Sequence, residues 1–389
     1  MDIGRKINVF NYYPLEFMGG GEYTALFLFN TLRDHFSLTY YSSKQYSGKL
    51  RATENIIAEA VKFNYKHIDF LWYSPIRVPI IIKPFPSLLD LDADLNVIYV
   101  SGGIPPKFFK ELARTDKRVL FLMHGITFEK LRFRSTQDIL ISIHQLFIRI
   151  TLQFAFKYVK INKNIFFQIF NKSQENYLKK LGVDYPRLFY IPSGVDFNRY
   201  IIGKNEQEFR IVFLSRMENL TKGLKVLKKV VKRISILVPN IKFVLIGTGK
   251  DSKIASSMEK HFHSVEYKGF IEDEKKLEEL LNANLMISTS NIEPFPLNVL
   301  EGLASGLPVV CTDYSGSWAI KENEIFGRVS IRNVKQVTAW ILWYYDQWYS
   351  NKEKYYQEKL SRRNEAKKFY DSKKMSEEYK KCFIKITAP

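Results

Sequence analysis

Two glutamates spaced eight positions apart are the side chains in this sequence best placed to do chemistry. Glu293 and Glu301 both lie in the stretch from Leu285 to Thr312, LMISTSNIEPFPLNVLEGLASGLPVVCT. Its pattern predicts a strand, a turn, a helix and a second buried strand, which together form half of a parallel sheet unit. Ligands of open α/β sheets bind beyond the carboxyl ends of the strands. We therefore expect both carboxylates to face one ligand-binding crevice.

The helix of this unit is predicted to begin at Pro296, between strands over Leu285 to Thr289 and Val309 to Thr312. Proline suits a first helical position because its φ is already helical and an amide hydrogen there would have no partner. The backbone amides of Leu297 and Asn298 would be unpaired at this helix start. Such amides attract anions, so this turn suits a phosphate group.

Two cations follow an earlier strand of the second half, predicted over Arg210 to Leu214. Arg216 comes directly after this strand, and Lys222 ends the loop before the next helix. A guanidinium and an ammonium can both contact phosphate oxygens, although a surface Arg and Lys near a helix start is the favoured interpretation without further context. The next strand, Lys242 to Ile246, leads into Gly247. The third glycine of the dinucleotide-binding fingerprint is missing there, which argues against a dehydrogenase.

The first half of the sequence also alternates strands and helices. After a strand over Ile7 to Asn11, three glycines that include Gly20 precede a helix beginning near Glu22. This arrangement can hold an anion, although a glycine turn is often only a turn. A strand over Val119 to Met123 ends in His124, at the sheet edge where ligands bind, but a lone histidine is commonly structural. Further strands are expected over Phe70 to Ser74, Val97 to Ser101 and Ile165 to Phe170.

The composition indicates a globular protein of two or three domains. Its 389 residues are 46% hydrophobic and 15% aromatic, and a net charge of +19 is spread over both halves. Two cysteines are too few for a disulfide framework, and the sequence opens on a short strand instead of a secretory signal, so we expect a cytoplasmic protein. Alternating aspartates at 90, 92 and 94 precede a strand, which favours a solvated turn over a metal site.

The segment from Ile139 to Ile161 is apolar but contains too many polar residues to span a membrane. It could be a packed core helix or a helix that lies at a membrane surface. Seven Lys or Arg and one acidic residue occur between Lys130 and Lys163. This balance is compatible with peripheral attachment to the cytoplasmic membrane face, but a packed core helix with a basic flank is the favoured interpretation.

A set of ordered motifs resembles those of the retaining, nucleotide-sugar-dependent glycosyltransferases of family four. In the second half these motifs are LSRMENLTKG, VLIGTGKD, YKGFIED, two glutamates in E-x7-E spacing, and EGLASGLPVV. The glycine pair before the first helix, His124 and the stretch IPSGVDFNRY fit the same family more loosely. Pro294, Pro296 and Ser193 stand where the family usually has Gly, Gly and Asn.

The resemblance implies an α/β protein with the GT-B fold, in which two Rossmann-like domains face each other across a cleft. A break rich in proline and glycine between Asp184 and Tyr200 places the domain boundary. We expect an acceptor-binding domain over 1–188, a donor-binding domain over 189–365 and a helix over 366–389 that packs back toward the first domain.

The resemblance also implies a retaining hexosyltransferase that uses a UDP- or GDP-sugar and a glycan or lipid-linked acceptor, with no metal or other cofactor. Glu293 would bind the donor sugar hydroxyls and Glu301 the ribose hydroxyls. The expected catalytic residues are Arg216, Lys222, Glu293 and His124. The expected donor-binding residues are Gly20, Gly247, Gly269, Ile271, Leu297, Asn298 and Glu301. The expected acceptor-binding residues are Tyr12, Tyr13, Glu22 and Tyr23.

Two other classes of function are weighed against this one. A noncatalytic GT-B subunit could bind a nucleotide sugar or a glycan without turnover, but the complete set of two cations and two glutamates argues against it. Nucleic-acid binding would rest only on the net charge and the aromatic content, because no recognised module is present.

Overall fold

The computed structural model describes most of the chain in two long runs and several shorter ones. The described residues are 4–11, 13–17, 19–43, 52, 54–68, 72–73, 80–81, 92–100, 112–128, 131, 136–160, 162–317, 320, 323–330 and 333–388.

The contacts divide the chain into two compact units. Unit 1 consists of Met1–Ser193 together with Ser372–Pro389, and unit 2 consists of Gly194–Asp371. The sequence boundaries were predicted after residues 188 and 365. The chain therefore returns to unit 1 after completing unit 2.

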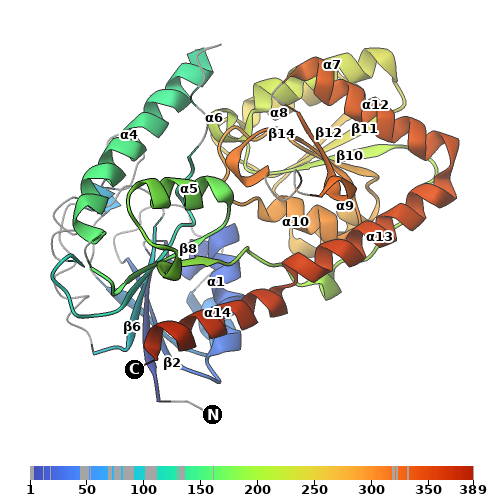
Figure 1. The fold of residues 1–389 in the computed structure, drawn as a ribbon. Helices are drawn as coiled ribbons and strands as arrows, with labels where there is room; N and C mark the ends of the chain where they lie inside the picture. The colour runs from blue at the N-terminus through green and yellow to red at the C-terminus, as the bar shows by residue number, and fades with distance from the viewer. Residues whose placement is uncertain are drawn as a thin grey trace. The chain divides into compact units, whose positions relative to one another are not determined.

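Unit 1 is built on a parallel sheet whose seven strands have the order β3-β2-β1-β6-β7-β8-β9 (Figure 1). Its central strands are buried almost throughout, which is typical of a parallel sheet covered on both faces. In sheet order the strands are β3 (Asn64–Ile68), β2 (Ser37–Ser43), β1 (Lys6–Asn11), β6 (Leu95–Tyr99), β7 (Val119–Leu122), β8 (Ile165–Ile169) and β9 (Leu188–Tyr190).

Helices cover both faces of this sheet. On one face, α1 (Gly20–Leu32) and α14 (Ser372–Thr387) pack on alternate residues of the strands, so Phe29 and Phe383 share a core with Val9. On the other face, α4 (Thr136–Val159) and α5 (Lys172–Lys180) pack on the intervening residues. A short helix, α2 (Glu54–Ala60), precedes β3.

The strand predicted over Phe70 to Ser74 is wrong as a member of the parallel sheet. Its described part, β4 (Trp72–Tyr73), pairs antiparallel with β5 (Ile80–Ile81) in a separate sheet of two strands. The sheet edge is formed instead by β2 and β3, which the sequence analysis missed. β2 consists mainly of Ser, Thr and Tyr, so its alternating burial is not evident as a run of aliphatic residues.

Unit 2 also has a parallel sheet, of six strands in the order β12-β11-β10-β13-β14-β15 (Figure 1). These strands are β12 (Val265–Gly269), β11 (Lys242–Ile246), β10 (Arg210–Leu214), β13 (Leu285–Ser288), β14 (Val309–Thr312) and β15 (Gly327–Ser330). The four strands predicted in this half, which correspond to β10, β11, β13 and β14, are therefore present.

Two sets of helices enclose the second sheet. α7 (Leu224–Leu237), α8 (Ser252–His261) and α12 (Val334–Ser350) share one core with Ile211, Phe243 and Ile287. α10 (Leu297–Ala304) lies so close to β13 that a side chain at Gly302 would meet the sulfur of Met286. Among the described residues of this unit, further helices are α6 (Asn219–Lys222), α9 (Asp273–Leu281) and α13 (Lys352–Tyr370). Single 3-10 turns in the chain occupy Leu15–Phe17, Tyr185–Arg187, Phe197–Arg199, Ser315–Ser317 and Glu324–Phe326.

Both sheets have a point at which the strand order reverses. In unit 2 the chain moves from β10 outward through β11 and β12, then returns to β13 on the other side of β10. In unit 1 the equivalent neighbours are β1 and β6. Loops that leave two adjacent strands at such a point diverge and leave a crevice at the carboxyl ends, where ligands of open α/β sheets bind.

Candidate functional site

Lys222 and Glu293 meet at the reversal point of the second sheet. Lys222 follows β10 and Glu293 follows β13, and the two strands are neighbours. The Lys222 ammonium forms an ion pair with Oε2 of Glu293. Their side chains are only 11% and 16% exposed. The structure therefore brings together one predicted cation and one predicted carboxylate in a partly buried pair.

Backbone contacts fix the position of this pair. The Thr289 hydroxyl donates to the carbonyl of Lys222 at 2.9 Å, and the Asn291 amide donates to the carbonyl of Thr221 at 2.7 Å. The Asn291 side chain adds a bond of 3.0 Å to the carbonyl of Leu220. The loop after β13 thus holds the short helix α6, and with it Lys222, beside the strand that leads to Glu293.

Two glycines permit the loops to approach this closely. Gly223 has a φ of +67°, and a β-carbon there would lie 2.0 Å from the carbonyl oxygen of Thr289. Gly247 has a φ of +125°, and a β-carbon there would lie 2.0 Å from the carbonyl oxygen of Ser215. Any side chain would therefore displace backbone on either side of the β10 exit loop.

Arg216, the second predicted cation, is not paired with either predicted glutamate. Its guanidinium lies 4.0 Å from Oε2 of Glu218, and its side chain is 56% exposed. Burial opposes ionisation of Glu218, but the charge of Arg216 and a hydrogen bond from Thr221 outweigh it, so the pKa of Glu218 is below its ordinary value. Arg216 is accessible to an anionic ligand at the end of β10.

Glu301 has different partners from Glu293. Its Oε1 accepts hydrogen bonds from the Lys276 ammonium at 2.8 Å and from the Tyr200 hydroxyl at 3.1 Å. Burial works against the charge of Lys276, but Glu301 and Asp273 outweigh it and raise the pKa of Lys276. Burial and the charge of Glu301 raise the pKa of Tyr200, so its hydroxyl remains a donor.

The start of α10 differs slightly from the prediction. The helix begins at Leu297, and Pro296 is the residue before it, with a φ of −87° and a ψ of 95°. Within the described residues, the backbone amides of Leu297 and Asn298 have no protein acceptor. The Asn298 side chain donates to the carbonyl of Leu214 at 2.6 Å, which ties this helix start to the end of β10. The two amides are thus in place for an anion.

Gly269 is the last residue of the edge strand β12, and Ile271 follows that strand. The carbonyl of Gly269 accepts a hydrogen bond of 2.6 Å from the amide of Gly247, which joins two of the predicted donor-binding positions. Gly269 has a φ of +65°, and a β-carbon there would have nothing within 4 Å. Ile271 is half-buried directly before α9.

His124 and Gly20 belong to unit 1, whereas the cations and both glutamates belong to unit 2. The His124 ring lies between Tyr99 and Phe170, with ring centroids 4.8 and 4.6 Å away, and Nε2 is 3.4 Å from the Tyr379 hydroxyl. Burial lowers the pKa of His124 to about 3, so the imidazole is neutral at physiological pH. Gly20 is the first residue of α1, and Gly19 precedes it as the N-cap.

The predicted acceptor residues have varied environments. Tyr12 lies outside the described residues. Tyr13 stacks on Phe17 at a centroid distance of 5.2 Å, and Tyr23 is 42% exposed. Glu22 is buried, and its Oε1 accepts a hydrogen bond of 3.4 Å from the Asn11 side chain. Tyr23 therefore has an exposed aromatic ring and Tyr13 a half-buried one, whereas Glu22 is part of the interior.

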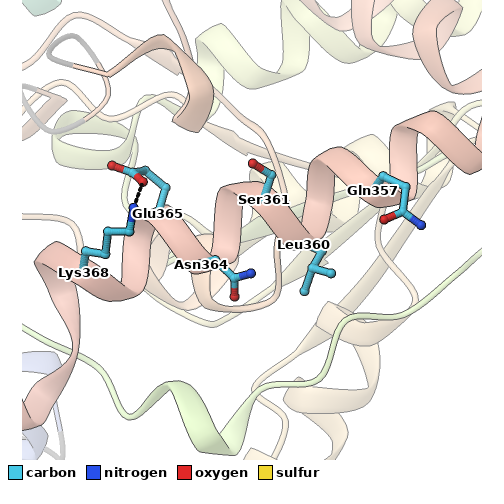
Figure 2. Close-up of a pocket in the computed structure, with 6 residues that line it drawn as sticks. All are labelled: Gln357, Leu360, Ser361, Asn364, Glu365 and Lys368. Atoms are coloured by element: carbon cyan, nitrogen blue, oxygen red, sulfur yellow. Dashed lines mark hydrogen bonds and ion pairs between the residues drawn. The ribbon is translucent and has the colours of Figure 1, made fainter.

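A pocket elsewhere in unit 2 contains none of the predicted site residues. Figure 2 shows it along α13, where an ion pair of 2.7 Å joins Glu365 and Lys368. Its lining residues are Gln357, Leu360, Ser361, Asn364, Glu365 and Lys368. A single helix lines it, and it has no second element to enclose a ligand, so we place the candidate site at the reversal point. Among the described residues, no group of three or more His, Cys, Asp and Glu could hold a metal ion.

Sequence reasoning missed several residues that organise this site. Lys276 and Tyr200 bind Glu301, and Asp251 accepts the backbone amide of Asn219 at the start of α6 at 2.7 Å. Tyr200 lies inside the motif IPSGVDFNRY, which could have drawn attention to it. Lys276 is one of several charged residues on α9, and nothing in its local pattern distinguishes it from a solvent-exposed lysine.

The two parallel Rossmann-like sheets, each with a reversal point, define the GT-B fold. The structure of Anabaena HepE in complex with UDP and glucose has this fold with a TM-score of 0.65, over 97% of this chain and 99% of that chain, at 14% identity. Residues 195–359 match the family model described as Glycosyl transferases group 1. This match lies in unit 2 and agrees with the sequence resemblance.

Two curated relatives are similar to part of the chain. Poly(glycerol-phosphate) alpha-glucosyltransferase of Bacillus subtilis is 30% identical over 168 residues, which are 39% of this chain and 24% of the relative. One component of the phosphatidylinositol N-acetylglucosaminyltransferase of Arabidopsis thaliana is 29% identical over 150 residues, 37% of this chain and 33% of the relative. The matched stretches thus span about a quarter and a third of these relatives.

Proposed function

We propose that this protein is a nucleotide-sugar-dependent glycosyltransferase that moves a hexose-type sugar to a glycan or lipid-linked acceptor. The observation that carries the proposal is the pair Lys222 and Glu293, held by backbone contacts at the reversal point of the sheet in the family-matched unit. Both curated relatives are named as hexose-type transferases, one for glucose and one for N-acetylglucosamine. HepE was solved with UDP and glucose, which favours UDP as the nucleotide.

In this proposal, different groups of the site contact the diphosphate and the sugar of the donor. The Lys222 ammonium and the accessible Arg216 guanidinium neutralise charge that develops on the diphosphate as its bond to the sugar breaks. The unpaired amides of Leu297 and Asn298 bind a phosphate oxygen. Glu293 accepts hydrogen bonds from the hydroxyls of the donor sugar. These bonds replace part of the contact that Glu293 makes with Lys222 in the absence of the donor. No metal is needed for these roles.

The acceptor side of the proposal involves unit 1. The neutral imidazole of His124 can donate to or accept from a sugar hydroxyl but carries no charge for binding phosphate. Tyr13 and Tyr23 offer aromatic faces that suit either a sugar ring or an apolar chain. Peripheral contact with the cytoplasmic membrane face is part of the proposal. None of the described helices combines the length and apolar character needed to cross a membrane.

A panel of donors tests the proposed reaction. Purified protein is incubated with UDP-glucose, UDP-N-acetylglucosamine and the GDP-sugars, with and without lipid extract, and nucleotide release is measured in the presence of EDTA. We expect the wild type to release nucleotide from one of these donors, and we expect the Glu293→Gln variant not to release it. Glu278→Gln, an exposed glutamate on α9, is the matched control and should retain release.

Three other results of the donor panel would contradict parts of the proposal. Donor binding without release under every acceptor condition would favour the noncatalytic subunit. Binding of no nucleotide sugar would contradict the donor site, and release that depends on added metal would contradict the role given to the two cations.

A further inference from the structure

Helix α4 has apolar residues on two opposite sides. Leu152 and Val159 are buried in the core that α4 shares with the sheet of unit 1, and the buried Ile141 lies on the same side of the helix by its spacing. A second set faces solvent, and the exposed fractions of its side chains lie between 39% and 59%. We call this set the α4 apolar face: Ile139, Leu140, Ile143, Leu146, Phe147 and Ile150.

The spacing of the α4 apolar face makes it one continuous stripe. Ile139, Ile143, Leu146 and Ile150 recur at intervals of four, three and four, so they lie along one side of the helix, with the other two beside them. Such a stripe normally packs against a core, and a contiguous exposed apolar patch indicates an interaction surface. The stripe is about 17 Å long at 1.5 Å per residue, which is too short to cross a bilayer.

The charge around α4 indicates what covers the stripe. The sequence from Lys130 to Lys163 has seven Lys or Arg and one acidic residue, and Lys160 and Lys163, just beyond the helix, are exposed. A second copy of this chain would bring its own net charge of +19 to the contact, which opposes self-association. We propose that the α4 apolar face binds an anionic lipid surface, with the helix lying in the plane of the headgroups.

Vesicle binding by the full chain tests this surface. We compare vesicles of phosphatidylcholine alone with vesicles that contain about a third phosphatidylglycerol, at low and high salt. The variant Ile143→Ser/Leu146→Ser removes two residues of the stripe. The matched control is Ile236→Ser/Leu237→Ser, which changes two exposed apolar residues at the end of α7 in unit 2.

We expect binding to the anionic vesicles only, at least tenfold weaker in the α4 variant and unchanged in the α7 control. High salt should weaken the wild type. Binding that is equal for both kinds of vesicle, or equal for both variants, would overturn the proposal. So would a wild-type dimer that the α4 variant converts to a monomer, because the stripe would then be covered by a second copy.

A second inference concerns Glu301 and comes from independent contacts in unit 2. Both hydrogen bonds to its carboxylate end on Oε1, where Lys276 and Tyr200 donate. Lys276 is itself held, because its ammonium also lies 2.8 Å from Asp273, whose other oxygen binds Arg199 at 2.9 Å. Among the described residues both donors contact Oε1, so the carboxylate is fixed through that oxygen and Oε2 can accept from a ligand.

We infer that Lys276 and Tyr200 are positioning residues that aim Oε2 of Glu301 at the ribose hydroxyls of the nucleotide. This inference rests on the proposed donor site. The strength of a hydrogen bond to a carboxylate depends on the alignment of donor and acceptor. A carboxylate that is held in one orientation therefore distinguishes a ribose from a dideoxyribose better than a carboxylate that can rotate.

The readout is the ratio of affinities for UDP and for 2′,3′-dideoxy-UDP, measured by calorimetry. The wild type should prefer UDP by at least about tenfold, which is the expected loss for a hydrogen bond to a charged group. Lys276→Met should reduce the preference to about threefold or less, whereas Lys276→Arg should retain most of it. Lys275→Met, an exposed lysine on the same helix, is the matched control and should retain all of it.

The outcomes separate the positioning role from the proposed function. Binding of UDP with the same or a larger preference in Lys276→Met would overturn the positioning role alone. Equal affinity of the wild type for UDP and 2′,3′-dideoxy-UDP would show that Glu301 does not bind the ribose hydroxyls. Binding of neither UDP nor GDP would contradict the donor site itself.

Discussion

Replacing Lys222 with methionine is expected to lower the rate of sugar transfer by about 100- to 1000-fold. This is the usual effect of removing one group that stabilises charge in the transition state. Lys222 is the cation that the fold buries beside Glu293, so no water or flexible side chain replaces it readily. Nucleotide release at saturating donor is the measurement, with Lys225→Met, an exposed lysine three residues further on, as the control.

Loss of the lysine also leaves Glu293 without its partner, so activity and stability must be separated. Breaking one side of a partly buried ion pair destabilises more than removing both sides. We expect Lys222→Met to unfold at a lower denaturant concentration than the wild type, and Lys222→Met/Glu293→Gln to recover part of that loss. Transfer should stay low in both variants. A Lys222→Met protein that keeps a third or more of the wild-type rate would contradict the role of Lys222.

Replacing Gly223 with alanine is expected to lower the free energy of unfolding by about 3 kcal/mol. Roughly 1 kcal/mol comes from placing a β-carbon in the left-handed region, and a further 1–3 kcal/mol comes from overpacking. The added carbon would lie 2.0 Å from the carbonyl oxygen of Thr289, which is backbone and cannot rotate away. Denaturant unfolding measures the change.

Gly269→Ala separates the two contributions. Gly269 has nearly the same φ, +65° against +67°, but a β-carbon there has nothing within 4 Å. This variant should lose only the conformational part, about 1 kcal/mol. Equal losses in the two variants would show that the loop after β13 moves aside without cost. Lys222 would then not be held by the contact that the Thr289 hydroxyl makes with its carbonyl.

The family-matched unit was the more predictable half of the structure. Strands such as Arg210–Leu214 and Val309–Thr312 are continuous apolar runs that are buried on both faces, and their bounds agree with the prediction. Unit 1 was less predictable. Its strand Ser37–Ser43 owes its burial to tyrosines that pack in the core, and polar residues around them hide the pattern.

The sequence indicated which residues to examine at the candidate site, but it did not indicate the contacts between them. The sequence indicated that Lys222 and Glu293 follow strands, and the sheet order makes those two strands neighbours. It could not indicate that Glu301 pairs with Lys276 from a different helix, because that contact depends on how α9 and α10 pack. The roles assigned to individual site residues remain predictions for the experiments above.

Helix α14 has a consequence for how the protein is made. Unit 2 is one continuous segment, and its two ends leave side by side, where the Val195 amide donates to the carbonyl of Tyr370 at 2.9 Å. Unit 1 needs Tyr379 and Phe383 of α14 to complete the core beneath its sheet. During synthesis, domains usually fold in the order in which they emerge. In this protein the synthesis of unit 1 starts first, but its core can be completed only after all of unit 2 and α14 have been synthesised.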